Sequence, residues 1–388
     1  MPLANAYLNA SDLDQAEDRY PLNARVCDRC WLVQLDHVIA PEILFDDYAY
    51  FSSFSDTWLE HAREFAGWAV DTFRLHPESC VVEVASNDGY LLKHFIDRGI
   101  PVLGIEPAVN IAEAARAAGI PTDIRFFGKE VARDLREQGF VADLLVGNNV
   151  VAHAPDINDF VAGLALLIGP EGVISLEFPH LLQLVEGIQF DTIYHEHSFY
   201  LSLHALETIL ERHELTILDV VELETHGGSL RVLATPLGNS KEPTEASETI
   251  RRKEDKAGLR DIDTFHRFAE RVDRCRAELR AFLDRCKSDG KTVVAYGAAA
   301  KGNTLLNYCD INSRHISYVV DRSPHKQGLF LPGSHLPIRH PDAVQETKPD
   351  YLVVLPWNLK DEIVAQMSSV REWGGRFVIP VPQVQVLE

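Results

Sequence analysis

The stretch Val81-Val-Glu-Val-Ala-Ser-Asn-Asp-Gly89 indicates how the middle of the chain folds. It begins as a short run of β-branched residues, which is typical of a buried strand, and it ends in polar residues and a glycine. Similar apolar runs follow at Pro101–Ile105, Ala142–Val146 and Gly172–Glu177, with helical spacing between them. Strands that alternate with helices in this way predict an α/β fold, with a parallel sheet covered by helices on both faces.

The same rhythm returns near the carboxyl end. Strands are expected at Thr292–Tyr296, Ile316–Val320, Tyr351–Leu355 and Phe377–Val381, which predicts a second, smaller α/β domain of the nucleotide-binding type. The chain is thereby divided into four parts: an irregular amino-terminal segment (1–50), a first α/β domain closed by an antiparallel strand pair (51–236), a helical link (237–290) and a carboxyl-terminal α/β domain (291–388).

The helical link carries one apolar stripe. Its apolar residues are three and four positions apart: Phe265, Phe268, Val272, Cys275, Leu279, Phe282 and Cys286. This spacing predicts a long helix that packs on the domains it connects, or a coiled coil with a partner. The first interpretation is favoured, because the stripe spans only about three heptads.

Composition excludes several classes of protein. The 388 residues include 46% hydrophobic and 24% charged residues, as in a folded globular protein, and the net charge is −21. An acidic chain is not expected to bind nucleic acid or an anionic membrane surface. The longest apolar run, Phe160 to Gly169, is about half of what a membrane helix needs. With no signal-like amino terminus and six scattered cysteines, we expect a cytoplasmic protein.

Polar residues follow the first strand where a ligand would bind. Glu83 is followed by Asn87-Asp88-Gly89, and this loop lacks the three glycines that let a backbone approach a pyrophosphate. The next strand ends in Glu106-Pro107, where an acid suits ribose hydroxyls. An adenosine with a charged amino-acid tail fits both observations. A generic doubly wound domain with surface acids is the alternative.

The fourth strand adds Asn148, Asn149 and His153. The polar groups that follow the first, second and fourth strands resemble, in this order, the successive motifs of class I S-adenosylmethionine-dependent methyltransferases. The resemblance implies that these residues, with Glu83, Asn87 to Gly89, Glu106 and Pro107, bind S-adenosylmethionine. One departure is Ala85, where many members of that family carry glycine, so the backbone is expected to lie less close to the ligand there.

A second constellation is Tyr194-His195-Glu196-His197. Four consecutive titratable side chains after an apolar stretch are costly to bury without a purpose. Histidine can exchange a proton near neutral pH, and tyrosine can donate a hydrogen bond to an oxyanion. A surface loop, or a metal site through His195 and His197, is the alternative; the metal site is weaker because neither histidine has a further ligand nearby in sequence.

Together with Thr225-His226-Gly227-Gly228-Ser-Leu-Arg231, this constellation resembles the sugar C-methyltransferases, which methylate nucleotide-linked 4-keto-6-deoxy sugars. The resemblance continues to Leu355-Pro-Trp-Asn358. It implies a Rossmann-like methyl-donor domain, a smaller Rossmann-like carboxyl-terminal domain, and a nucleotide-linked keto-sugar bound between them.

The family resemblance also assigns roles to particular residues. Tyr194, Glu196 and His197 are implied in catalysis, with His197 as the base, and His226, Gly227, Gly228 and Tyr50 are implied in substrate binding. In a straight strand Tyr194 and Glu196 would point one way and His197 the other. If all three act on one substrate, this segment must be bent.

The loop Gly297-Ala-Ala-Ala-Lys301-Gly302 lies between a predicted strand and a predicted helix. Backbone amides at such a junction can hold phosphate, and Lys301 adds positive charge. We therefore expect it to contact the nucleotide diphosphate, with Arg322 and Lys326 as further candidates. Tight packing by small residues is the alternative explanation.

Cys27-x-x-Cys30 has zinc-ligand spacing, but a structural zinc needs four ligands and the sequence has no second CxxC pair. The family has a zinc-binding amino-terminal domain, whose first cysteine pair precedes a segment like Pro2 to Tyr7. Met1 begins at that segment, so a late start codon and a loss of the pair both stay open, and zinc is expected at most at half a site. Two ordinary thiols are the alternative.

Two other functions are compatible with these motifs: an O- or N-methyltransferase of small metabolites, and a non-catalytic protein that binds nucleotide-linked sugars. The sequence leaves open which sugar and nucleotide are bound, whether C3 or C5 is methylated, and whether the protein is a monomer or a homodimer.

Overall fold

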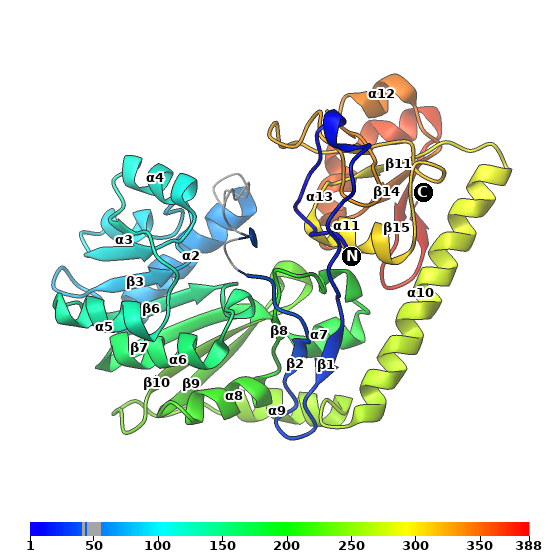
Figure 1. Ribbon diagram of the computed structural model, residues 1–388. Helices are drawn as coiled ribbons and strands as arrows, with labels where there is room; N and C mark the ends of the chain where they lie inside the picture. Colours follow the sequence, from blue (N-terminus) through cyan, green and yellow to red (C-terminus); the bar gives the residue numbers. More distant parts are fainter. Residues whose placement is uncertain (41–42, 45–55, 388) are drawn as a thin grey trace.

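The computed structural model describes residues 1–40, 43–44 and 56–387, which form two α/β domains with an amino-terminal segment at their junction (Figure 1). The first domain is built on a seven-stranded sheet of order β5-β4-β3-β6-β7-β10-β9. Its strands are β3 (Val81–Val84), β4 (Val102–Ile105), β5 (Thr122–Asp123), β6 (Ala142–Asn148), β7 (Ile168–Pro179), β9 (Leu215–Leu223) and β10 (Ser229–Pro236).

Strands β3 to β7 are parallel, and β10 is antiparallel to both β7 and β9. The predicted parallel sheet with a closing antiparallel pair is therefore confirmed. The strand order reverses at β3, between β4 on one side and β6 on the other. In open α/β sheets the ligand crevice lies beyond the carboxyl ends of the strands at such a point.

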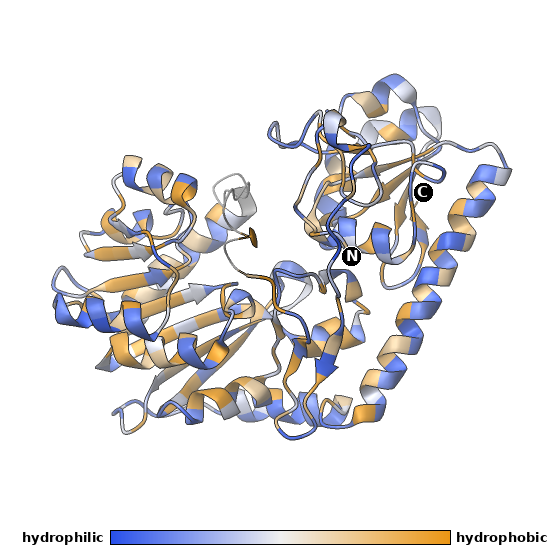
Figure 2. Cartoon of the chain, in the orientation of Figure 1, coloured by the Kyte–Doolittle hydropathy of each residue, from blue (hydrophilic) through white to orange (hydrophobic). Residues whose placement is uncertain are grey.

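Helices cover both faces of this sheet, as the alternating pattern predicted. One face packs against α2 (Asp56–Phe73), α3 (Lys93–Ile96) and α4 (Val109–Ala117). The other packs against α5 (Lys129–Glu137), α6 (Ile157–Leu167) and α8 (Leu203–Glu211). Figure 2 shows the strands as the most hydrophobic part of the domain, because their side chains are enclosed on both sides.

The carboxyl-terminal domain has a six-stranded sheet of order β13-β12-β11-β14-β15-β16, in which only β16 is antiparallel. Its strands are β11 (Val293–Tyr296), β12 (Val319–Val320), β13 (Ile338–Arg339), β14 (Tyr351–Val354), β15 (Arg376–Ile379) and β16 (Gln385–Leu387). Its helices are α11 (Ala300–Tyr308), α12 (Ala343–Thr347) and α13 (Lys360–Gln366). The sequence pattern missed β13 and β16, because runs of two or three residues carry no readable period.

The long helix α10 (Ile262–Ser288) runs along the side of this domain (Figure 1). Asp261 caps its amino-terminal end, where the Asp261 side chain accepts a hydrogen bond from the amide of Asp263. Its stripe from Val272 to Cys286 lies in the core of the carboxyl-terminal domain, while Phe265 and Phe268 pack near α7 (Leu181–Glu186) of the first domain. The stripe is thus covered within the chain, as the favoured interpretation predicted.

The amino-terminal segment is more ordered than expected. Strands β1 (Ala24–Val26) and β2 (Val33–Leu35) form an antiparallel hairpin, which β8 (Phe199–Tyr200) of the first domain extends to three strands. The prediction of an irregular segment is therefore wrong for residues 24–35. The hairpin depends on a strand far away in sequence, which no local pattern reveals.

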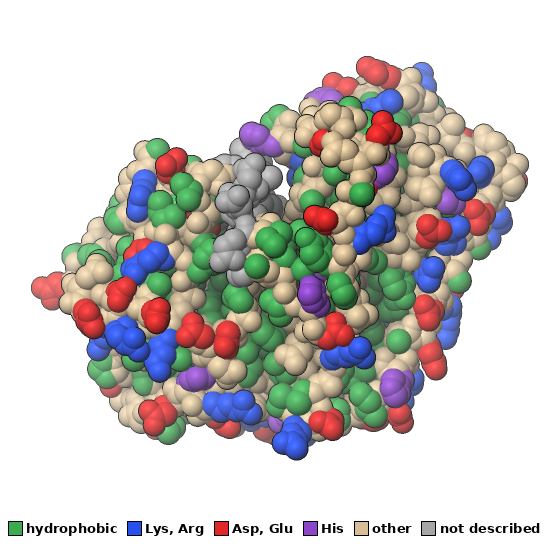
Figure 3. Space-filling view, in the orientation of Figure 1, with side chains coloured by type: hydrophobic (Ala, Val, Ile, Leu, Met, Phe, Trp, Pro, Cys, Tyr) green, Lys and Arg blue, Asp and Glu red, His purple; other side chains and the backbone are tan. Residues whose placement is uncertain are grey.

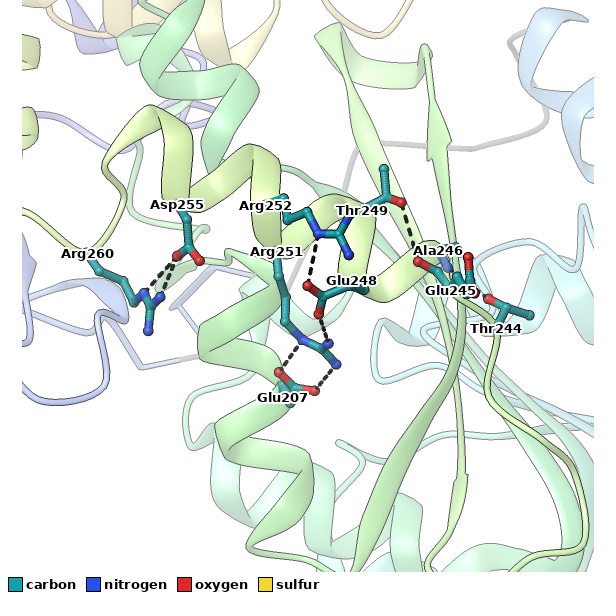
Figure 4. A network of polar contacts seen from close by, with 10 residues as sticks. All are labelled: Glu207, Thr244, Glu245, Ala246, Glu248, Thr249, Arg251, Arg252, Asp255 and Arg260. Atoms are coloured by element: carbon teal, nitrogen blue, oxygen red, sulfur yellow. Dashed lines mark hydrogen bonds and ion pairs between the residues drawn. The ribbon is translucent and has the colours of Figure 1, made fainter.

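Charged side chains form local pairs on the surface. Helix α9 (Ala246–Ala257) is tied to α8 by Arg251, whose guanidinium binds Glu207 at 2.6 Å and Glu248 at 3.0 Å (Figure 4). On the face in Figure 3, Lys and Arg are interspersed with Asp and Glu. None of the helices in the described ranges is both long and apolar enough for a membrane span.

Candidate active site

The loops beyond β3 and β4 are held together by Glu106. Its Oε2 accepts a hydrogen bond of 3.0 Å from the amide of Asn87, and its Oε1 accepts one of 2.9 Å from the amide of Ala108, just past Pro107. Burial raises the pKa of Glu106, and these amides oppose that shift. Each carboxylate oxygen can accept a second hydrogen bond, so both remain able to bind a hydroxyl group.

The backbone of this loop has an unusual conformation. Ala85, Asn87 and Gly89 have φ angles of 55°, 49° and 80°, in the left-handed region. A side chain at Gly89 would place its Cβ 2.5 Å from Cγ1 of Ile120, so glycine is required there. Ala85 occupies a position that favours glycine, which accounts physically for the glycine in many related methyltransferases.

Three acids converge at this edge of the sheet. Burial raises the pKa of Glu83 well above its usual range, and the nearby charges of Glu106 and Asp88 raise it further. Within the described ranges, Oε2 of Glu83 and Oδ1 of Asn148 and of Asn149 are buried without a hydrogen-bond partner. Such acceptors suit a ligand with hydroxyl donors and positive charge, so the residues present fit S-adenosylmethionine.

The catalytic candidates lie in a tight turn between η4 (Phe190–Thr192) and β8. The amide of His197 donates to the carbonyl oxygen of Tyr194 at 2.9 Å, so the chain reverses within four residues. This turn brings the rings of Tyr194 and His197 to a centroid distance of 4.1 Å. The segment is bent, which is the condition that a shared role of Tyr194, Glu196 and His197 requires.

Hydrogen bonds define the protonation of His197. Its Nδ1 lies 2.9 Å from the carbonyl oxygen of Thr192, and its Nε2 lies 3.0 Å from the hydroxyl oxygen of Tyr194. A carbonyl only accepts, so we assign the ring hydrogen to Nδ1 and a free lone pair to Nε2, which accepts from Tyr194. Burial, and then the imidazole of His153, hold the pKa of His197 well below its usual range. His197 is therefore a neutral imidazole that can accept a proton.

His153 and His226 connect His197 with the loop that follows β6. The ring of His153, from η3 (Val151–His153), lies 4.9 Å from that of His197 in an edge-on arrangement. His226 lies 3.3 Å from Nδ2 of Asn149, at the end of β6. Burial lowers the pKa of His153 and of His226 to about 4. The predicted donor and catalytic groups thus meet in one region.

Glu196 lies in the same turn, but its side chain points toward the amino-terminal segment. It is buried, and burial raises its pKa to about 7. Its Oε1 accepts a hydrogen bond of 2.6 Å from Nδ2 of Asn5, in the amino-terminal segment. Sequence reasoning missed Asn5; the only available signal was its place in the family-like segment Pro2 to Tyr7.

His195 belongs to a different environment. Its Nε2 lies 3.2 Å from the carbonyl oxygen of Pro21, and its ring lies edge-on to Tyr20. His195 and His197 thus have separate partners, which argues against a metal site formed by this pair. Throughout the part of the chain that the structure describes, there is no group of three or more metal-ligand side chains. Cys27 and Cys30 flank the hairpin turn as free thiols.

The loop η5 (Thr225–Gly227) is closed over by the carboxyl-terminal domain. A Cβ at Gly227 would lie 2.6 Å from the Trp357 ring, and one at Gly228 would lie 2.5 Å from Cγ of Gln183. Both glycines have positive φ angles. Close approach of other groups therefore explains the two glycines, and their carbonyl and amide groups are brought to the junction of the domains.

A buried network that sequence reasoning missed supports this loop. Glu177, at the end of β7, accepts hydrogen bonds from Arg231 at 2.8 Å and from the Thr225 hydroxyl at 3.1 Å, and it lies 3.0 Å from His61. Although burial opposes it, His61 and Arg231 hold the pKa of Glu177 below its usual value. Arg231 of the quoted motif was visible in the sequence, but its partners were not.

The predicted basic residues of the carboxyl-terminal domain are separated. Lys301 donates to Oδ1 of Asn358 at 2.8 Å and lies 4.7 Å from the centre of the Trp357 ring, and burial lowers its pKa. Lys326 donates to the carbonyl oxygen of Ala298 at 2.9 Å. Arg322 lines a different hollow of about 480 Å³, whose lining includes neither lysine. The three do not form a single cluster.

The glycine-rich loop is shaped by packing. A Cβ at Gly297 would lie 2.4 Å from Cγ of Pro356, and one at Gly302 would lie 2.8 Å from Cβ of Leu355. The amide of Ala298 donates to Asp321 at 2.8 Å, and an acid at this position would repel a phosphate. These contacts support the packing explanation of both glycines. Tyr50, the remaining predicted substrate residue, lies outside the described residues.

Comparison with known proteins gives three matching family models. A putative zinc binding domain matches residues 1–45, a methyltransferase domain matches residues 58–220, and the C-methyltransferase C-terminal domain matches residues 224–382. The chain is also 30% identical over 98 residues to the ubiquinone biosynthesis O-methyltransferase of Rhizobium etli, which covers 24% of this chain and 38% of that protein. The structure of magnesium protoporphyrin IX methyltransferase from Synechocystis covers 50% of this chain and 88% of its own, with 14% identity and a TM-score of 0.36.

One relative matches from end to end. The C-methyltransferase NovU of Streptomyces niveus is 37% identical over 386 residues, which is 100% of this chain and 92% of that protein. This similarity spans the loops after β3, β4 and β6, the Tyr194–His197 turn and the carboxyl-terminal domain. The chain therefore belongs to the C-methyltransferase family and is a methyltransferase.

Proposed function

We propose that this enzyme transfers a methyl group from S-adenosylmethionine to a ring carbon next to the ketone of a nucleotide-linked 4-keto-deoxysugar. The observation that carries the proposal is the pair formed by Tyr194 and His197. A neutral imidazole with its lone pair on Nε2, bound to a tyrosine hydroxyl, is the machinery for removing a proton beside a carbonyl group.

The substrate chemistry explains why such a pair is needed. A carbon next to a ketone becomes a nucleophile only after it loses a proton, and the resulting enolate oxygen needs a hydrogen-bond donor or a cation. When bound, S-adenosylmethionine supplies a methyl group on a positively charged sulfur. The new carbon–carbon bond forms as the carbon–sulfur bond breaks, and the proton stays on the enzyme.

We assign the proton to Nε2 of His197. On substrate binding, the Tyr194 hydroxyl turns from Nε2 to the ketone oxygen, where it stabilises the developing negative charge. Lys301 adds a positive charge, since its ammonium group acts on both His197 and His226. Glu196, with a pKa of about 7, can donate or accept a proton near neutral pH.

The rest of the substrate is assigned to the junction of the domains. Gly227 and Gly228 keep the His226 loop close to this junction, because a Cβ at Gly227 would meet the Trp357 ring. Lys326 is the basic side chain that borders the junction beside Ala298. Arg322 is an exposed candidate for the nucleotide, in the neighbouring hollow. Tyr50 stays the candidate for the sugar that the family resemblance suggests.

The test is a screen of nucleotide-linked keto-sugars with methyl-labelled S-adenosylmethionine. We expect label on a ring carbon of the keto-sugars, and none on the matching sugars in which the ketone is reduced to a hydroxyl. Carbon-13 spectra of the product distinguish a C-methyl from an O-methyl group. Label on oxygen or nitrogen would contradict the proposal, as would equal transfer to the reduced sugars.

A further inference from the structure

We propose that Asn5 of the amino-terminal segment is a positioning residue that orients the carboxyl group of Glu196 for the methyl-transfer reaction. This inference rests on the proposed function only for the role of Glu196 in catalysis. The contact itself is a hydrogen bond of 2.6 Å from Nδ2 of Asn5 to Oε1 of Glu196, between residues 191 positions apart in the chain.

Asn5 is itself held firmly in place. The carbonyl oxygen of Ala4 accepts a hydrogen bond of 3.1 Å from Asn303, and Leu8 pairs in both directions with Phe330 at 2.9 Å. All of these partners belong to the carboxyl-terminal domain. The side chain of Asn5 is therefore a fixed donor, anchored on one domain and bound to an acid of the other.

Tyr7 completes this link from the same segment. Its hydroxyl oxygen lies 2.6 Å from the carbonyl oxygen of Ala298 and 3.2 Å from Oδ1 of Asn5. Lys326 donates to the same carbonyl oxygen and lies 5.3 Å from the centre of the Tyr7 ring. A continuous set of polar contacts thus runs from Glu196 through Asn5 and Tyr7 to the glycine-rich loop.

Among the described residues, groups that act on Glu196 come from the amino-terminal segment, the carboxyl-terminal domain and η3. The amino-terminal segment supplies Asn5 and Tyr7, and the negative charge of Glu196 raises the pKa of the Tyr7 hydroxyl. The carboxyl-terminal domain supplies Lys326. The ring of His153 forms a hydrogen bond with the Glu196 backbone. Burial favours the neutral acid, whereas the Asn5 amide and the Lys326 charge favour the carboxylate. Removing the amide should therefore shift the balance toward the protonated acid.

An amide is well suited to this role. The NH₂ group of asparagine donates and carries no charge, so it fixes one carboxylate oxygen without forming an ion pair that would lock the acid in its charged form. Because the amide holds Oε1, the exchangeable proton of Glu196 is assigned to Oε2. Its orientation then depends on the docking of the amino-terminal segment on the carboxyl-terminal domain.

The experiment is a carbon-13 NMR titration of carboxyl-labelled glutamate in the full chain, with Glu196→Gln to assign the signal. Asn5→Ala should raise the titration midpoint of Glu196 by about one pH unit, since a hydrogen bond to the charged form is lost. Asn5→Asp should raise it further, because two carboxyl groups at this distance share a proton. Asn9→Ala is the matched control: Asn9 belongs to the same segment, but its exposed side chain donates to Asp12, so the midpoint should stay in place.

The second readout is the pH profile of methyl transfer. The inflection that belongs to Glu196 should move with the NMR midpoint in Asn5→Ala, whereas a merely structural defect would lower the rate at every pH. An unchanged NMR midpoint in both folded Asn5 variants would overturn the inference. If wild type methylates no keto-sugar, the proposed function fails, but the NMR titration still decides the contact between Asn5 and Glu196.

Discussion

The indole nitrogen of Trp357 donates a hydrogen bond of 2.7 Å to Oδ2 of Asp191, and this bond joins the carboxyl-terminal domain to the first domain. Asp191 is fully buried and lies in η4, shortly before the Tyr194–His197 turn. The same indole ring packs against Gly227 and lies under Lys301. One side chain therefore contacts the segment before the Tyr194–His197 turn, the His226 loop and Lys301 of its own domain.

Replacing Trp357 with phenylalanine should destabilise the protein. An aromatic ring is retained, but the buried carboxyl group of Asp191 loses the indole donor, which costs about 1–3 kcal/mol. Thermal unfolding should show a lower midpoint. Trp373→Phe is the control: its indole nitrogen donates to a neutral carbonyl, that of Pro349 at 3.0 Å, so the loss should be smaller. Equal midpoints for Trp357→Phe and wild type would show that the contact contributes nothing to stability.

Asp191 should also make stability depend on pH. Burial raises its pKa to about 6, from about 3.9 in an unfolded chain, so the folded state favours the protonated acid. This contribution is complete below about pH 4 and is lost as the pH rises through 6. Asp191→Asn keeps an acceptor for Trp357 and stays neutral. Its stability relative to wild type should therefore increase between pH 4 and 7, measured by urea unfolding.

Asp350→Asn is the control for this measurement, because the contribution of Asp350 to stability should depend on pH in the opposite direction. The amide of Thr292, then Lys291, hold the pKa of Asp350 below its usual value, so its contribution is present at neutral pH and lost as the pH falls. The Asp350→Asn variant should be less stable than wild type at pH 7 and as stable as wild type in acid. Parallel pH profiles for Asp191→Asn and wild type would contradict the assignment to Asp191.

Glu254 on α9 should be among the most sensitive structural positions. It is buried, lies 2.7 Å from Nε2 of His180, and accepts hydrogen bonds from the amides of Leu203 and His204 at the start of α8. Glu254→Ala leaves these groups unpaired and should cost about 3–5 kcal/mol. Glu248→Ala, on the exposed side of the same helix (Figure 4), should change the unfolding midpoint within experimental scatter. Similar losses of stability in Glu254→Ala and Glu248→Ala would show that Glu254 is no more important for folding than an exposed acid.

Glu106 should contribute strongly to binding of the methyl donor. Its two oxygens already organise the loops of Asn87 and Ala108, and a ribose hydroxyl would add a hydrogen bond to a charged group. Glu106→Ala should weaken binding of S-adenosylmethionine by about 1–3 kcal/mol, measured by calorimetry. Glu113→Ala, an exposed acid on α4, should bind as wild type does. Unchanged affinity in Glu106→Ala would remove this residue from the donor site.

The sequence predicted the two α/β domains well because each long strand and helix carries its own period. Strands such as β3 and β6 are mostly apolar, and α10 repeats its apolar stripe over several turns. Strands β1, β2, β8 and β13 are two or three residues long, so their pairing depends on tertiary contacts. Local patterns do not contain that information.

The candidate site shows the same division. Tyr194, Glu196 and His197 are adjacent in sequence, and one motif was enough to single them out. Asn5 meets Glu196 across 191 residues, and the partners of Glu177 come from α2, η5 and β10. Such contacts are set by the fold, so neither spacing nor composition could reveal them.

His197 is the residue on which the proposed chemistry depends most. Asparagine at this position keeps polarity and much of the shape, but it cannot accept the proton. With a nucleotide-linked keto-sugar and a donor analogue that cannot transfer its methyl group, wild type in heavy water should exchange one ring proton beside the ketone. His197→Asn should still bind both ligands and should exchange this proton about 10²–10⁴-fold more slowly.

His195→Asn is the control, because the ring of His195 faces the carbonyl oxygen of Pro21, and this variant should exchange the proton at the wild-type rate. The exchanged position, read by NMR, reports whether C3 or C5 is attacked. Exchange at wild-type speed in His197→Asn would exclude this imidazole as the base, and Glu196 would become the first residue to test in its place.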